Sequence, residues 1–206
     1  MSKVKWTPEE MYNWYNYNID RVNRTLFFGP WNDADTGLGS AESRDPWEVN
    51  DWSAQNIIKG LHILEQEGDE AITLNWLSYG GDWNAGMAIY DYMKTCKSHI
   101  TMKCFGRVRS MGTIILQAAD ERLISPNCEF MIHYGSLAIA ETHSKNAAVE
   151  LELENRNNAK MEEIYLERIR EKKARFSKTK LQELITYDKF MTPNEAIDLG
   201  LADKIL

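Results

Sequence analysis

A serine separates a basic stretch from an apolar one in the segment CFGRVRSMGTIILQAAD, residues 104–120. Two interpretations fit Ser110. Serine is a favoured helix N-cap because its hydroxyl accepts a hydrogen bond from an unpaired backbone N–H, and the segment alone favours this interpretation. The same placement can also expose the hydroxyl at the positive end of a helix dipole, beside free N–H groups.

A serine hydroxyl is a poor nucleophile until a base takes its proton, and histidine is the usual base near neutral pH. His133 ends the apolar stretch EFMIH and precedes a Tyr-Gly pair. Of the other histidines, His62 lies in a helical pattern, His99 lies at the start of a strand pattern and His143 lies in a polar segment. A lone strand-end histidine is more typical of a structural residue, so His133 is a candidate base and no more at this point.

The glycine pair and the cysteines are weaker indications of a functional site. The pair Gly80-Gly81 follows the apolar stretch AITLNWL and is by itself typical of a tight turn. The cysteines are odd in number and lack metal-ligand spacing: Cys96, Cys104 and Cys128. Each lies in or beside a predicted apolar element, which favours reduced, packed thiols over a nucleophile.

Alternating strand and helix patterns surround these residues. Strands are predicted at 25–29, 71–77, 99–105, 122–125 and 129–133, and helices at 51–67, at 113–119 and around Met87–Met93. A loop rich in Gly, Pro, Asp and Ser is predicted at 30–50. The alternation predicts an α/β fold with a mainly parallel sheet, in which sites form at the carboxyl ends of strands. The glycine pair, Ser110 and His133 all follow predicted strands.

The composition changes between Thr142 and Phe176, where a long charged helix is predicted. At about 1.5 Å per residue it would extend roughly 50 Å. Its apolar seam is thin: Leu153, Met161, Ile164 and Ile169. We expect it to project and its seam to contact another copy of the chain, with a solvated helix at the edge of the same core as the alternative.

The segment TPNEAIDLGL predicts a short helix close to the end of the sequence. Thr192 is the expected N-cap, Pro193 the first helical residue and Glu195 the partner in a capping box. The fourth residue before Thr192 is Asp188, which on its own is an ordinary acid before a helix.

The composition is ordinary for a globular protein of 206 residues, with 43 % hydrophobic and 27 % charged residues, and predicts one domain. A net charge of −7 without a basic block argues against a nucleic-acid partner. The sequence begins without the apolar core of a signal peptide, and no segment approaches the roughly 20 apolar residues that span a bilayer. We therefore expect a cytoplasmic protein without a membrane segment.

Five blocks resemble ClpP, the proteolytic subunit of the Clp protease, in order and approximate spacing: FFG, SYGGDWNAGMAIYDYM, GRVRSMGTIIL, ADERLISPNCEFMIH and YDKFMTPNEAIDLGLADKIL. The resemblance covers roughly residues 19–206. It implies a single ClpP-like serine peptidase domain over 1–206. The implied fold is a ClpP/crotonase-like α/β superhelix of β-β-α units, with residues 142–176 as a protruding handle helix.

The resemblance also implies a site. The family's nucleophile falls on Ser110, its base on His133 and its acid on Asp188. Such a triad is defined by geometry and roles, and its carboxylate fixes the imidazole tautomer and stabilises the imidazolium. The backbone N–H groups of Gly81 and Met111 would stabilise the oxyanion.

The sequence departs from the family pattern around these residues. Tyr79 replaces a proline before the glycine pair, His133 is followed by Tyr-Gly in place of Gln-Pro, and Tyr187 replaces an arginine. The apolar SLAIAET replaces a glycine-rich stretch, the loop at 30–50 is longer, and the amino-terminal EEMYNWYNYNID differs from the gate-forming segments. Arg107 and Arg109 replace small residues, and they are interpreted as binding acidic groups of a substrate or partner, or carboxylates of a neighbouring subunit. The departures support catalysis more than ring stacking, gating or unfoldase docking.

The resemblance implies a serine endopeptidase that hydrolyses unfolded proteins or peptides through an acyl-enzyme inside a homo-oligomeric, heptameric ring. Two stacked rings (a tetradecamer) and an AAA+ Clp unfoldase are further expectations. No cofactor is expected, because SYGGDWNAG lacks the Gly-Lys-Ser/Thr of a P-loop and ATP would be used only by the unfoldase. The alternatives are a non-catalytic ring subunit, a processing protease that needs no unfoldase, and a crotonase-like acyl-CoA enzyme. Retention of all three triad residue types argues against a non-catalytic ring subunit, which would have no need of them. It also argues against an acyl-CoA enzyme, in which the serine, histidine and aspartate would share no role.

Overall fold

The computed structural model describes residues 6–29, 45, 47–135 and 143–206. The helices are α1 (Pro8–Tyr17), α2 (Asp51–Glu67), α3 (Trp83–Thr95), α4 (Met111–Leu116), α5 (Ser144–Lys172), α6 (Lys178–Leu184) and α7 (Pro193–Leu199). The strands are β1 (Ile19–Asp20), β2 (Thr25–Phe28), β3 (Glu48–Val49), β4 (Ile72–Ser78), β5 (Gly80–Gly81), β6 (Ile100–Arg109), β7 (Glu121–Ile124), β8 (Glu129–Ile132), β9 (Lys189–Met191) and β10 (Lys204–Ile205).

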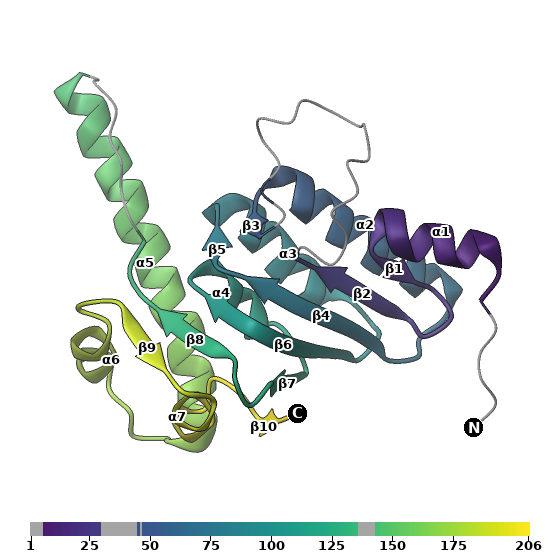
Figure 1. Ribbon diagram of the computed structural model, residues 1–206. Helices are drawn as coiled ribbons and strands as arrows, with labels where there is room; N and C mark the ends of the chain where they lie inside the picture. The colour runs from purple at the N-terminus through teal and green to yellow at the C-terminus, as the bar shows by residue number, and fades with distance from the viewer. Residues whose placement is uncertain (1–5, 30–44, 46, 136–142) are drawn as a thin grey trace.

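An eight-stranded sheet forms the centre of the molecule, with helices α2 and α3 behind it in Figure 1. Its strands run in the order β1-β2-β4-β6-β7-β10, while β8 pairs with β6 and β9 pairs with β8. The central pairs β2–β4, β4–β6 and β6–β7 are parallel. The predicted α/β class and mainly parallel sheet are therefore confirmed.

On the edge opposite β4, strand β6 has two partners in succession. Its first half, Thr101–Cys104, pairs with β7, and its second half, Arg107–Arg109, pairs with β8. Between them lies Gly106, whose φ of +60° is a conformation that favours glycine. The predicted strand ended at residue 105 because its apolar pattern stops there. The second partner extends β6 to the residue before Ser110.

Most predicted elements are confirmed, including α2, α3 and the capping box at Thr192 and Glu195. The helix predicted at 113–119 is also present, but α4 covers 111–116 and so begins directly after Ser110. The elements that were not predicted from the sequence are α1, α6, β1, β3, β9 and β10. Four of these are strands of two or three residues, too short to show a periodic pattern. Strand β3 lies inside the predicted loop, and β5 is the predicted turn at the glycine pair. The two strands pair in parallel as a second, small sheet.

Helix α5 is shorter than predicted. It covers 144–172, whereas the prediction covered 142–176, of which 142 lies outside the described residues. The helix ends at Lys172 because the chain turns back there, and Arg170 donates a hydrogen bond to the carbonyl of Phe176 within that turn. The reversal lets α6 bury Leu181, an energy gain that a longer α5 would forgo.

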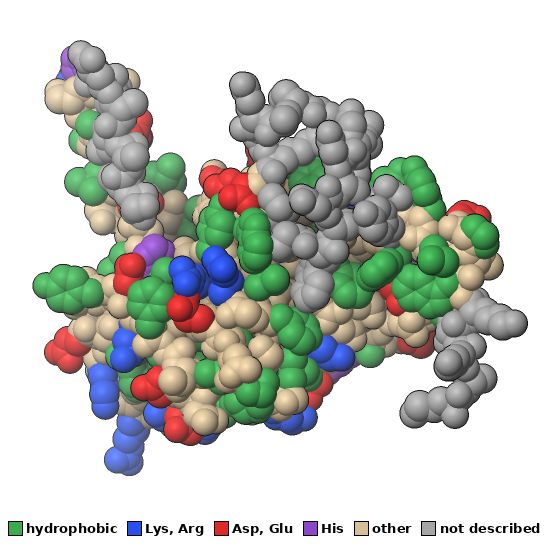
Figure 2. Space-filling view, viewed as in Figure 1, with side chains coloured by type: hydrophobic (Ala, Val, Ile, Leu, Met, Phe, Trp, Pro, Cys, Tyr) green, Lys and Arg blue, Asp and Glu red, His purple; other side chains and the backbone are tan. Residues whose placement is uncertain are grey.

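The two halves of α5 lie in different surroundings. The carboxyl-terminal half packs into the core, where Met161, Ile164 and Ile169 are buried. The amino-terminal half projects from the body of the molecule, and Figure 2 shows hydrophobic side chains along it. These include Val149, Leu151 and Leu153, each about half exposed. Of the four residues in the predicted apolar seam, three therefore pack within the chain, and only Leu153 lies on the projecting half, where it could contact another copy.

Within the described ranges, no helix is both long enough and apolar enough to cross a bilayer.

Candidate active site

Ser110 lies at a strained turn between β6 and α4. Its φ of 49° and ψ of −127° are an uncommon conformation for a residue with a side chain. Its backbone N–H donates to the carbonyl of Met131, at the end of the β6–β8 ladder, and this bond holds the turn. The side chain makes no cap hydrogen bond to α4. The capping interpretation of Ser110 is therefore wrong, because this backbone conformation turns the hydroxyl away from the helix.

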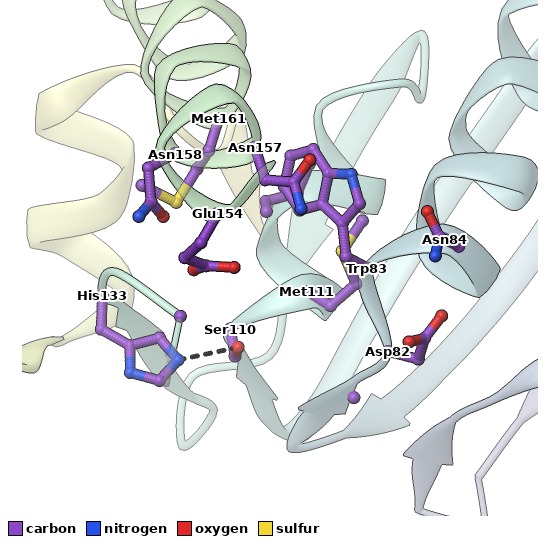
Figure 3. Close-up of a pocket in the computed structure, with 13 residues that line it drawn as sticks. Asp82, Trp83, Asn84, Ser110, Met111, His133, Glu154, Asn157, Asn158 and Met161 are labelled. Carbon is purple, nitrogen blue, oxygen red and sulfur yellow. Dashed lines mark hydrogen bonds between the residues drawn. The ribbon is translucent and has the colours of Figure 1, made fainter. Parts of the chain in front are cut away.

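The hydroxyl of Ser110 contacts His133 instead (Figure 3). The Ser110 Oγ to His133 Nε2 distance is 2.8 Å, and the His133 Nδ1 to Asp188 Oδ1 distance is 3.1 Å. With its proton on Nδ1, the imidazole donates to Asp188 and accepts the hydrogen bond of the serine. The structure thus brings together the three residues that the resemblance assigned to a triad, while their catalytic roles stay a prediction.

Strand pairing explains this convergence. Strands β6 and β8 are parallel neighbours, so their carboxyl ends place Ser110 and His133 at one edge of the sheet. Strands β8 and β9 are antiparallel, with Ile132 opposite Lys189. The next residues outward in that register are His133 and Asp188. Two ladders therefore align three side chains that lie far apart in the sequence.

The glycine pair lies against Ser110. A Cβ atom on Gly80 would lie 2.6 Å from the Cβ of Ser110, so only glycine lets β5 approach the turn this closely. A Cβ on Gly81 would collide with the backbone of Val49 in β3. Gly81 and Met111 both line the cleft that contains Ser110. This position is compatible with the predicted oxyanion donors, whose role stays a prediction.

A chain of hydrogen bonds supports the carbonyl of Ser110. The hydroxyl of Thr113 lies 2.6 Å from this carbonyl oxygen and donates to it. The same hydroxyl lies 2.6 Å from the hydroxyl of Tyr165 in α5. Burial raises the pKa of Tyr165, which keeps this phenol protonated and able to donate. Helix α5 is therefore linked to the backbone of the turn.

A second link joins α5 to the residue after His133. Tyr134 donates a hydrogen bond of 2.5 Å to Glu162, which also accepts from Gln182 and pairs with Lys178 at 2.7 Å. Burial alone raises the pKa of Glu162, but hydrogen bonds from Lys178, Tyr134 and Gln182 outweigh it and leave the pKa lowered. The charged carboxylate thus ties α5 and α6 to the end of β8. Sequence analysis missed this residue, although a glutamate among the apolar residues of α5 was a visible signal.

Ser110 and His133 line a cleft of about 440 Å³. The cleft lies between the sheet edge and α5 (Figure 3). The residues that line it are Gly81, Asp82, Trp83, Asn84, Ser110, Met111, Ile114, His133, Gly135, Glu154, Asn157, Asn158 and Met161. A space of this size accommodates a few residues of an extended peptide.

Arg107 and Arg109 have partners within the chain. Arg109 pairs with Glu129 of β8, and its guanidinium lies over the ring of Phe190. The guanidinium of Arg107 lies 4.9 Å from the centre of the Trp47 ring. Sequence analysis expected acidic partners on a substrate or a neighbouring subunit. For Arg109 the structure supplies the carboxylate from the adjacent strand β8, where Glu129 lies opposite Arg107, two residues before Arg109.

The remaining candidate nucleophiles and bases lie outside this cleft. His62, His99 and His143 are not among its lining residues. The thiols of Cys104 and Cys128 are buried, which raises the pKa of both, for Cys128 to about 12. A thiol is nucleophilic as the thiolate, so these residues suit packing, as predicted.

A hydroxyl, an imidazole and a carboxylate in series at a sheet edge are the arrangement expected of a serine hydrolase. The comparisons with known proteins give the family. Residues 46–206 match the Clp protease family. The ATP-dependent Clp protease proteolytic subunit of Deinococcus radiodurans is 30 % identical over 161 residues, which are 77 % of this chain and 76 % of that protein. The chain belongs to the Clp protease family, and it is a hydrolase of the serine peptidase type.

Proposed function

We propose that the protein is an endopeptidase that cleaves unfolded proteins or peptides through an acyl-enzyme on Ser110. The observation that supports this most directly is the contact of His133 with both Ser110 and Asp188, at 2.8 Å and 3.1 Å. His133 takes the proton of Ser110 as the hydroxyl attacks the scissile carbonyl, and it then protonates the leaving amine. Water attacks the acyl-enzyme in a second round, with His133 again as the base.

The remaining groups stabilise charge. Asp188 keeps the proton on Nδ1 of His133 and stabilises the imidazolium that forms. The backbone N–H groups of Gly81 and Met111 stabilise the oxyanion, and loss of one such donor typically raises the barrier by about 3–4 kcal/mol. Protein side chains and backbone suffice for this chemistry, so the proposal includes no metal or organic cofactor.

The proposed working form is a homo-oligomer in the cytoplasm, a heptameric ring or two stacked rings that enclose the cleavage sites. The apolar residues on the projecting half of α5 support assembly, because each is between 49 % and 62 % exposed: Val149, Leu151 and Leu153. An enclosed site admits only unfolded chains. An AAA+ Clp unfoldase that uses ATP would supply them, in line with the name of the Deinococcus radiodurans relative.

Covalent labelling tests the nucleophile. A fluorophosphonate incubated with the assembled protein is expected to modify Ser110, with the adduct located by mass spectrometry of peptides. Asp188→Asn is expected to slow labelling strongly, because the tautomer and orientation of His133 depend on this carboxylate. An assembled protein that gains no adduct at Ser110 and cleaves no unfolded protein would instead be a non-catalytic ring subunit.

Mass photometry tests the assembly. A mass of seven or fourteen chains is expected at micromolar concentration, and a stable monomer would contradict the ring. Addition of an unfolded protein without any ATPase separates the two proteolytic alternatives, because a processing protease needs no unfoldase.

A further inference from the structure

One carboxylate in the cleft has no part in the chemistry proposed above. Glu154 extends from α5 towards the space between Ser110 and His133 (Figure 3). Within the described ranges of the chain, it makes no hydrogen bond or ion pair. A carboxylate beside a reaction space without a partner is unusual, because charge in a partly closed cleft is normally compensated.

No cationic residue lies one helical turn from Glu154, and Arg156 is only two residues away, which places it on a different face of α5. The residues one helical turn away on α5 are Glu150, Leu151, Asn157 and Asn158. Among the described residues that line the cleft, none is lysine or arginine. The other carboxylate of the cleft, Asp82, is already engaged, because its Oδ1 accepts the backbone N–H of Ala85 at 2.8 Å. Of the described lining residues, Glu154 is therefore the carboxylate without a partner.

The walls of the cleft are amphipathic. Met111, Ile114 and Met161 form an apolar wall, and each is at most 4 % exposed. Glu154 and the neighbouring amides of α5 form a polar wall. Lysine and arginine side chains match this arrangement, because their alkyl stems pack on apolar surface while their cationic heads reach polar groups.

We propose that Glu154 makes the cleft select a lysine or arginine side chain next to the scissile bond of the substrate. This inference rests on the proposed endopeptidase function. An apolar substrate side chain would remove water from Glu154 without replacing its hydrogen bonds, which is unfavourable. A basic side chain replaces them with a charge-assisted pair. The preference therefore has an attractive part and a repulsive part.

A peptide library gives the first test. The assembled protein is incubated with a mixture of unstructured peptides, and the new termini are identified by mass spectrometry. Cleavage sites with lysine or arginine adjacent to the scissile bond are expected to be enriched. Peptides cleaved without such enrichment, or with apolar residues enriched instead, would overturn the inference.

A matched pair of peptides gives the quantitative test. Arginine at the enriched position is compared with citrulline, which has nearly the same shape without the charge. The wild type is expected to favour arginine by about 10-fold in kcat/KM, the lower range for a hydrogen bond to a charged group. Glu154→Gln is expected to bring this ratio close to one, mainly through a loss of arginine turnover. Glu154→Lys is expected to favour glutamate at the same position.

Glu150→Gln is the matched control. It removes a carboxylate one turn away on the same helix face, and Glu150 is exposed and does not line the cleft. The ratio of arginine to citrulline is expected to be unchanged in this variant. An equal loss in both variants would show a general effect of charge on α5 and would overturn the role of Glu154. Fluorophosphonate labelling of Ser110 separates the two proposals, because a labelled, active enzyme without basic preference refutes only this inference, whereas an inert serine refutes both.

Discussion

Two residues with hydroxyl side chains each lie between a strand and the helix that follows it, but their hydroxyl groups have different roles. Ser110 follows β6 and begins α4, and Thr192 follows β9 and begins α7. Thr192 has extended backbone, with φ −69° and ψ 160°, and its hydroxyl accepts the N–H of Glu195 as an N-cap. Ser110 has φ 49° and ψ −127°, and its hydroxyl contacts His133.

The difference shows that the backbone conformation decides which role such a residue has. Extended backbone before a helix directs the hydroxyl at the first free N–H groups, as at Thr192. The turn at Ser110 ends a strand that has β8 beside it, and the bond from Ser110 N–H to Met131 carbonyl keeps the strained conformation. The neighbouring strand thus frees the hydroxyl for chemistry.

The largest expected contrast is between Ser110→Ala and Thr192→Ala in peptidase activity. Loss of the nucleophile is expected to lower kcat/KM by up to about 10⁶-fold, which corresponds to roughly 8 kcal/mol in the barrier. Thr192→Ala is expected to leave kcat/KM close to the wild-type value, because Thr192 is not a lining residue of the cleft. Steady-state cleavage of an unfolded protein measures both. Similar activity in the two variants would refute the distinction.

The next contrast concerns the support of the Ser110 turn. Thr113→Val removes the hydrogen bond to the carbonyl of Ser110 and leaves the buried hydroxyl of Tyr165 without its partner. Such a loss is expected to reduce the free energy of unfolding by about 1–3 kcal/mol.

Thr113→Ser keeps the hydroxyl and is the matched control for the support of the turn. Denaturant unfolding measures stability, and the rate of fluorophosphonate labelling reports the position of the Ser110 hydroxyl. Thr113→Val is expected to label more slowly, while Thr113→Ser is expected to label as the wild type does. Equal labelling in both variants would show that Thr113 serves stability alone.

The comparison also shows what could be predicted from the sequence. Thr192 was identified as an N-cap from Pro193 and Glu195, because a capping box is a local pattern and its geometry follows from neighbouring residues. The longer strands and α2 were predicted for the same reason. The alternation of these elements also predicted the α/β class.

Non-local contacts were harder to predict. Local pattern favoured a cap at Ser110 and a structural role for His133, since neither residue reveals the β6–β8 pairing that joins them. Asp188 had no local signal at all, and its candidacy came only from the resemblance to ClpP. Tyr134 and Glu162 meet through the packing of α5 on the sheet edge, which sequence spacing does not encode. Glu154 faces the cleft for the same reason.

Glycine substitutions are expected to act in opposite directions at the two helix starts. Ser110→Gly should raise the free energy of unfolding by about 1 kcal/mol, because glycine adopts a positive φ without strain. Thr192→Gly should lower it by a few tenths of a kcal/mol, roughly the loss expected when glycine replaces an N-cap side chain. Chemical denaturation of both variants measures the sign of each change in the free energy of unfolding. A loss of stability in Ser110→Gly would show that the turn is not strained.

The smallest expected effect is a pH dependence confined to the Thr192 cap. Hydrogen bonds from the backbone N–H and the hydroxyl of Thr192 hold the pKa of Glu195 below its ordinary value of 4.5. A carboxyl whose pKa is lowered by folding adds stability that is complete above its unfolded pKa and is lost as the pH falls through its folded pKa. Wild type and Glu195→Gln are therefore expected to differ in stability by a constant amount near neutral pH, and this difference should shrink below pH 4.5.

Asp198→Asn is the control for this titration, because Asp198 lies in the last turn of α7, away from the cap. An anion near a helix carboxyl terminus is unfavourable, so this variant is expected to gain a little stability at neutral pH where Glu195→Gln loses some. If the two variants change stability in opposite directions at neutral pH, the effect of Glu195 comes from the geometry of the cap. If both variants change stability in the same direction, the effect comes from net charge, and Thr192 would then not differ from Ser110 through its capping box.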